Sequence, residues 1–238
     1  MRKFVVTLLT TILAISAMAV DIPKQGFGFQ IGWAQPTLRL NSPSIGYPKD
    51  SLVNVTRLHG LKVGVVYDAC YIAGFGSSIG INYTFGAAST KWKQKNLSFS
   101  ERTQTFYHEL EVFVDWQYKF EVAKETYLIL YTGPSIQCGL VMDKTSFLRN
   151  ELTDEISSTK LNHYTTDIAD EAYTRLNVTW GIGAAFQYQR YFLRGGYDFG
   201  LINPYKNETF EAASDGRYTR GRFDQWSIKI GMYLWYDE

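Results

Sequence analysis

The sequence of 238 residues has little of what would indicate several common classes of protein. It has two cysteines and three histidines, and none of them cluster with the spacing of metal ligands, so neither a metal nor another cofactor is predicted. Basic and acidic residues nearly balance, at 24 and 23, which argues against nucleic acid as the main partner. After the N-terminal region, no segment has the ~20 consecutive apolar residues of a membrane-spanning helix.

The N-terminal region has the three parts of a secretory signal. Arg2 and Lys3 are followed by an apolar run over residues 4–15, and then by Ala17 and Ala19, the small residues that a signal peptidase reads. The run is too short to span a membrane as a helix. We therefore expect residues 1–19 to be a signal peptide and residues 20–238 to form one exported domain. Its net charge is −1, with 22 basic residues (24 − 2) against 23 acidic ones.

What the sequence does contain is an alternation of apolar and polar residues with period two, the pattern of β-strands. Gly (20), Tyr (17) and Phe (15) are abundant, as in twisted strands with crowded interiors. The alternation recurs in eight segments, at 27–33, 61–67, 75–85, 110–118, 127–140, 176–186, 193–201 and 226–236. The fifth is the least regular, because both of its faces are apolar in its first half and Pro134 interrupts it.

The connections between these segments alternate in length. Those after the first, third, fifth and seventh are polar and about 20 to 30 residues long, whereas those after the second, fourth and sixth are short. This alternation is typical of an antiparallel up-and-down transmembrane barrel with four long extracellular loops, short periplasmic turns and both termini in the periplasm. We predict an all-β protein with a single barrel of eight strands. A short hairpin within the third long loop, about residues 142–173, would raise the number to ten.

The two faces of the predicted strands differ in charge. The apolar positions carry no charged residue, which suits a lipid-facing surface, where one charge at the bilayer centre costs about 2–4 kcal/mol. The opposite positions are rich in Gly, Ser, Asn and Gln and hold nine charged residues, for which we predict an ion-pair network in the lumen: Lys62, Asp68, Glu109, Glu111, Asp115, Arg175, Arg194, Asp198 and Lys229. Because eight strands leave an interior that side chains just fill, we expect this network to plug the lumen.

Three segments resemble a known family: 131–135 (YTGPS), 195–201 (GGYDFGL) and the last strand. The pattern is similar to the small eight-stranded outer-membrane barrels of Gram-negative bacteria, of the OmpA transmembrane-domain and OmpX type. The resemblance implies outer-membrane lipid and lipopolysaccharide, together with the barrel-assembly machinery, as partners. It also implies an assembly signal at Lys229, Gly231, Leu234 and Tyr236, although Asp237 and Glu238 follow where the family usually ends on the aromatic residue. We expect Leu234 and Tyr236 to face lipid.

The sequence is compatible with four functions. The leading hypothesis is a non-enzymatic, monomeric outer-membrane protein that stabilises the envelope or presents its loops to an extracellular ligand. The second is a narrow diffusion channel. The third is a lipid-A-modifying enzyme, for which His108 could act with Glu109 and Ser100 near the outer rim. The fourth is a soluble ligand-binding barrel with its apolar face inside.

The two cysteines lie far apart on the predicted barrel. Cys70 falls in a periplasmic turn, and Cys138 about a dozen residues up the fifth strand. At ~3.3 Å per residue the separation is on the order of 25–30 Å, far beyond the ~7 Å limit for a disulfide. We therefore predict that both are unpaired.

Overall fold

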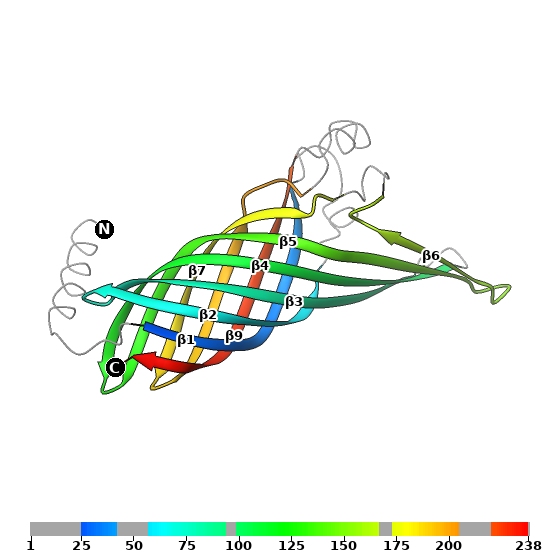
Figure 1. Ribbon diagram of the computed structural model, residues 1–238. Helices are drawn as coiled ribbons and strands as arrows, with labels where there is room; N and C mark the ends of the chain where they lie inside the picture. The colour runs from blue at the N-terminus through cyan, green and yellow to red at the C-terminus, as the bar shows by residue number, and fades with distance from the viewer. Residues whose placement is uncertain (1–24, 42–56, 94–98, 167–172, 205–219, 238) are drawn as a thin grey trace, which may run out of the picture.

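The computed structural model describes residues 25–41, 57–93, 99–166, 173–204 and 220–237. The predicted signal peptide, residues 1–19, lies outside the described residues. No helix in the described ranges has the length and apolar character needed to cross a membrane. The strands are β1 (Gln25–Asn41), β2 (His59–Ile72), β3 (Phe75–Lys93), β4 (Phe99–Ala123), β5 (Thr126–Asn150), β6 (Ile156–Asn162), β7 (Leu176–Tyr188), β8 (Tyr191–Gly200) and β9 (Arg220–Asp237) (Figure 1).

Eight of these strands close into a ring. Each pairs antiparallel with its neighbour in the order β4-β3-β2-β1-β9-β8-β7-β5, and a further pairing of β4 with β5 closes the sheet. The first and last strands of the chain lie side by side, with Gly32 opposite Lys229. The predicted fold, a single antiparallel barrel of eight strands, is confirmed. Within the ring, closure leaves no strand with a free edge.

Tight turns join the strands at one end of the barrel. They connect β2 to β3, β4 to β5 and β7 to β8, and each contains a non-glycine residue with positive φ: Ala73 (45°), Glu125 (55°) and Gln189 (51°). Positive φ is the backbone conformation that matches short hairpin turns to the twist of the strands they join. Strand β1 begins and β9 ends at this same end, where Gln25 pairs with both Ala69 and Asp237.

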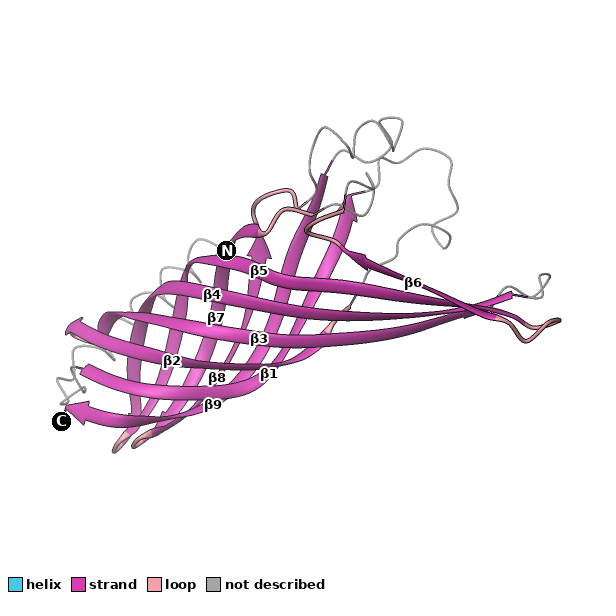
Figure 2. Cartoon of the chain, turned by 45° about the vertical axis from the view of Figure 1, so that its right-hand side comes forward, coloured by secondary structure: helices cyan, strands magenta, loops and turns pink. Residues whose placement is uncertain are grey.

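At the opposite end of the barrel, the prediction of long loops was partly wrong. Strands β3, β4 and β5 continue well past the rest of the barrel, with Lys91 opposite Arg102 and Ser100 opposite Arg149. Strand β6 adds to the edge of β5, so that β3, β4, β5 and β6 form a protruding sheet of four strands (Figure 2). The structure contains a hairpin within the predicted third loop. However, it adds one strand and not two, because its first strand is the continuation of β5.

The barrel wall is apolar outside and polar inside. Val112 of β4 is 43% exposed, whereas the preceding Glu111 is 3% exposed. The same contrast separates Ile81 from its buried neighbour Asn82 on β3. A soluble barrel with an apolar interior has the opposite arrangement, so that hypothesis is wrong.

Two irregular strands depart from simple alternation. Strand β5 is apolar on both faces because its inward residues Tyr127 and Ile129 form a small buried cluster with Ala185 at the turn end of the barrel. In β9 the register against β1 shifts between Phe27 and Gly28, which leaves both Leu234 and Trp235 exposed on the outside.

This bulge corrects one prediction. Leu234 faces outward as expected, but Tyr236 turns inward, stacks on Tyr233 at 5.2 Å between ring centroids, and accepts a hydrogen bond from Gln187.

Candidate functional site in the barrel interior

The interior side chains form three polar layers between an apolar mouth and the turn end. The outermost layer centres on Glu111, whose carboxylate lies 2.6 Å from the Lys62 ammonium. Glu111 also accepts hydrogen bonds from Asn82 (2.7 Å) and Gln137 (3.2 Å). Lys62 donates a second hydrogen bond to Gln225 of β9. Both charges are almost fully buried, and each has the partner and the additional hydrogen bonds that a buried ion needs.

Glu109, two residues before Glu111 on β4, extends this layer towards the mouth. It accepts a hydrogen bond from the Tyr107 hydroxyl and a longer one, 3.4 Å, from Gln225. Gln137 meanwhile accepts a hydrogen bond of 2.7 Å from Asn177. The layer therefore links side chains from six of the eight barrel strands, namely β2, β3, β4, β5, β7 and β9.

The middle layer is built on Arg194, which reaches across the barrel. Its guanidinium makes an ion pair with Asp115 of β4 and donates a hydrogen bond of 3.2 Å to Ser78 of β3. Strand β3 is four strands from β8 in either direction around the ring, so this contact joins opposite walls. The guanidinium also stacks on Tyr131, 3.7 Å from the ring centroid, and lies 5.3 Å from that of Phe113.

Two glycines make room for this layer. A Cβ on Gly183 would collide with the ring of Tyr131, and a Cβ on Gly196 would lie 2.5 Å from its hydroxyl oxygen. The Tyr131 hydroxyl donates a hydrogen bond of 2.9 Å to the carbonyl of Gly195. Interior glycine thus leaves space for the large side chains of facing strands, as the composition predicted.

The innermost layer lies near the turns. Asp68 accepts a hydrogen bond from Tyr233 and lies 3.7 Å from the ammonium of Lys119. Sequence reasoning missed Lys119, because the fourth segment was expected to end at Tyr118, whereas β4 runs on to Ala123. The odd-numbered, inward positions of this strand were a signal that could have found it.

The three remaining residues of the predicted network are Lys229, Asp198 and Arg175. Lys229 is buried, with its ammonium 5.5 Å above the ring of Phe113. Asp198 is half-buried on the inner face, beside Gly181. Arg175 is exposed beyond the barrel and donates hydrogen bonds to backbone carbonyls of β5 (2.9 and 3.3 Å), so its predicted place inside the lumen is wrong.

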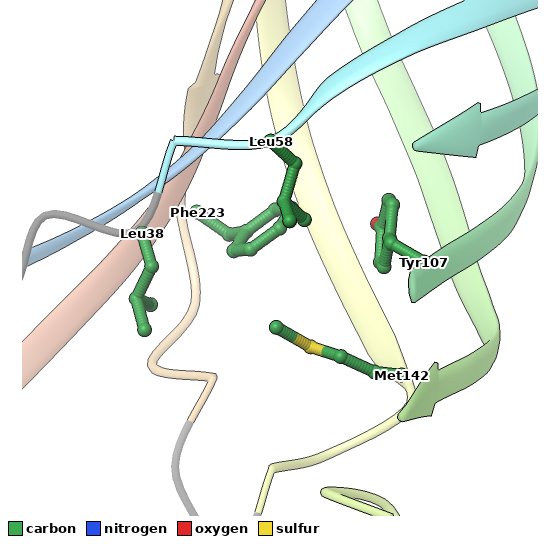
Figure 3. Packing of buried hydrophobic residues seen from close by; sticks show 5 residues of the cluster. All are labelled: Leu38, Leu58, Tyr107, Met142 and Phe223. Atoms are coloured by element: carbon green, nitrogen blue, oxygen red, sulfur yellow. The ribbon is translucent and has the colours of Figure 1, made fainter. Parts of the chain in front are cut away.

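An apolar cluster covers the polar layers at the far end from the turns. It consists of Leu38, Leu58, Tyr107, Met142 and Phe223, which converge from four strands and from the residue that precedes β2 (Figure 3). A cavity of about 20 Å³ lies beside it, with room for roughly one water molecule.

Tyr164 and Arg175 lie over this cavity, with the guanidinium 5.0 Å from the tyrosine ring centroid. Burial raises the pKa of Tyr164, so its hydroxyl stays protonated at physiological pH. These two side chains and the apolar cluster therefore lie at the end of the interior opposite the turns.

The three histidines occupy separate environments. His108 packs edge-on against Phe85 on the outer surface (ring centroids 4.9 Å apart) and hydrogen-bonds the hydroxyl of Tyr83. Glu109 points inward, so His108 and Glu109 lie on opposite faces of the wall and do not form the pair considered for the lipid-A-modifying alternative. His59 stacks on Trp33 and His163 on Tyr173, both outside the polar layers. The two cysteines are both free, as the barrel topology predicted.

Comparison with known proteins gives likenesses in structure alone. No family model and no curated protein sequence matches the chain. The structure is similar to that of Ail, the attachment invasion locus protein of Yersinia pestis (10% identity, 90% of this chain and 100% of that one, TM-score 0.39). It is also similar to Neisserial surface protein A (11% identity, 88% and 97%, TM-score 0.40). A third likeness is to the N-terminal barrel domain of Pseudomonas aeruginosa OprF (9% identity, 86% and 97%, TM-score 0.30).

Proposed function

We propose that the protein is a non-enzymatic integral outer-membrane barrel with a closed lumen and an interaction or structural role on the cell surface. The observation that carries this proposal is the inverted distribution of polarity: the outer wall is apolar around the whole ring, and the charges are buried inside. Such a surface is far larger than the few hundred Å² of contiguous apolar area that soluble monomers expose. A bilayer removes it from water.

Aromatic residues support the same placement. Tyr71, Tyr188 and Tyr191 are exposed near the turn end of the wall, and Trp33 and Phe85 are exposed towards the other end. Exposed aromatics at both ends match the girdles of outer-membrane barrels. We infer that the turns and both described ends of the chain face the periplasm, and that the protruding sheet faces outward.

The interior favours a plug over a diffusion channel. Arg194 joins opposite walls, and the apolar cluster covers the layer above it. An eight-stranded barrel offers little room beyond its side chains. The surface that remains for a function is therefore the part outside the membrane, which is the protruding sheet and the connections at that end. Partners that reach it include lipopolysaccharide and an extracellular ligand, and we expect the protein to act as a monomer.

Membrane fractionation tests the central premise. We expect the protein to require detergent for extraction and to migrate differently on gels before and after heating, since a closed barrel resists detergent at room temperature. Recovery in the aqueous fraction would refute the membrane location. Planar-bilayer recording tests the lumen separately: a closed interior gives no steady conductance, and regular single-channel openings would favour the channel.

A further inference from the structure

The outward face of the protruding sheet presents two cations directly opposite each other. Lys91 of β3 and Arg102 of β4 are register partners and therefore lie on the same face. Both side chains are exposed, and neither makes an ion pair with any residue that the structure describes. Directly opposed residues in an antiparallel pair have Cβ atoms about 4.5–5.5 Å apart, and like charges there are destabilising. An anion bound at both side chains would relieve this repulsion.

Two other cations of this face have anionic partners. Lys160 of β6 lies 3.0 Å from the carboxylate of Asp143. Arg149 of β5 donates a hydrogen bond of 2.8 Å from Nε to Asp154. Of these four cations, only Lys91 and Arg102 make no ion pair with a residue that the structure describes.

A hollow of about 550 Å³ lies at this pair. Its cationic side is formed by Lys91 and Arg102, and its apolar side by Phe147, which is the register partner of Arg102, and Ile156. Among the described residues, the lining also includes the cation of Arg149, which is paired with Asp154, and the carboxylates of Glu101 and Glu151. A ligand that combines an anionic group with a larger neutral or apolar part fits this arrangement.

The position of the pair relative to the apolar wall narrows the ligand class. Lys91 is six residues beyond Phe85 on the same face of β3, without a register shift against β4. Six residues extend about 20 Å, or about 15 Å above Phe85 once strand tilt is included. The exposed Phe106 of β4 lies opposite Ala87, so the pair is about 10 Å above the last apolar residue of the wall. An anion at that height, on a molecule whose chains pack against the wall below, belongs to a large headgroup. A simple phospholipid carries its phosphate closer to the acyl region.

We propose that Lys91 and Arg102 bind a phosphate group on the sugar headgroup of an outer-leaflet lipid, as in lipopolysaccharide. This rests on the proposed function, since it requires the wall below to lie in the outer membrane. The two donors act together: the Lys91 ammonium supplies a point charge and the Arg102 guanidinium supplies paired N–H groups that suit a phosphate.

Binding of fluorescent lipopolysaccharide to the full chain in zwitterionic detergent micelles tests the proposal. The test variant is Lys91→Gln with Arg102→Gln. The matched control is Lys124→Gln with Arg190→Gln, which removes the same charge from exposed positions in the turns at the other end. Heat-modifiable gel migration verifies that each variant is folded. The ligands compared are intact lipopolysaccharide, the same material with its phosphates removed, and a soluble sulfated polysaccharide.

The wild-type chain and the control should bind intact lipopolysaccharide equally. The test variant should bind it about tenfold more weakly, since two exposed charge contacts contribute about threefold each. Removal of the phosphates should weaken wild-type binding by a similar factor. Equal binding by test and control variants would overturn the site. Displacement by the sulfated polysaccharide at lower concentrations than lipopolysaccharide would overturn the lipid assignment. Failure of the membrane premise appears separately, as protein that needs no detergent to stay in solution.

Discussion

Arg194 offers the most demanding test of the interior. Replacing it with methionine removes the cation that pairs with Asp115 while roughly preserving the length of the side chain. The carboxylate is then left buried without its partner, because both side chains are nearly inaccessible. Breaking a buried pair in this way costs about 3–5 kcal/mol, and loss of the stacking on Tyr131 adds about 0.5–2 kcal/mol. We expect the free energy of unfolding to fall by roughly 4 kcal/mol or more.

A double-mutant cycle separates the ion pair from the rest of this loss. Asp115→Asn keeps the size of the side chain and removes its charge, so adding it to Arg194→Met should recover about 2–3 kcal/mol. The assay is urea-dependent unfolding of the barrel in lipid vesicles, followed by the heat-modifiable mobility of the folded form. Arg190→Met in the exposed β7–β8 turn serves as the control, with an expected change within about 0.5 kcal/mol. Additive costs of the two interior substitutions would refute the pairing.

Three further expectations concern the wall, the packing and the orientation. Val112→Arg on the outer wall should lower the free energy of unfolding in vesicles by about 2–4 kcal/mol. The control Gln104→Arg, on the same face of β4 but in the protruding sheet, should lower it little. Equal losses of stability would argue against a lipid-facing wall. Gly183→Val should destabilise far more than Gly195→Val in the same unfolding assay, because only the former meets Tyr131. In cells, with both native cysteines replaced, an impermeant maleimide should label Ser158→Cys on β6 and not Lys124→Cys in a turn; the reverse pattern would invert the orientation.

The positions of the barrel strands could be predicted from the sequence, but the residues at which the strands end could not. Alternation survives wherever one face meets an apolar surface and the other a polar one, as from Phe75 to Phe85. Past the wall both faces are polar, so the stretch from Ser89 to Thr103 has the composition of a loop although most of it is paired strand. Backbone hydrogen bonds hold the protruding sheet, and they leave little trace in side-chain type.

The sequence predicted most of the charged residues that line the interior, but not which of them contact each other. Parity alone identified Lys62, Glu111 and Arg194 as inward residues. It could not indicate which of them meet, because partners across a barrel depend on the stagger between strands that are distant in sequence. The bulge in β9 shows a second limit. One extra residue reverses every later side chain, and adjacent Leu234 and Trp235 are its only sequence mark.

The pairing of β1 with β9 has a consequence for the time course of folding. Gln25 and Asp237, near the two extremes of the described chain, become neighbours when the ring closes. Contacts of such high sequence separation form slowly, because the entropy of closing the loop must be overcome before the contact stabilises anything. The Arg194–Ser78 contact between opposite walls also requires a ring of the correct diameter. Zipping of β9 onto β1 should therefore be the late, rate-limiting event, after which the interior locks in a single cooperative step.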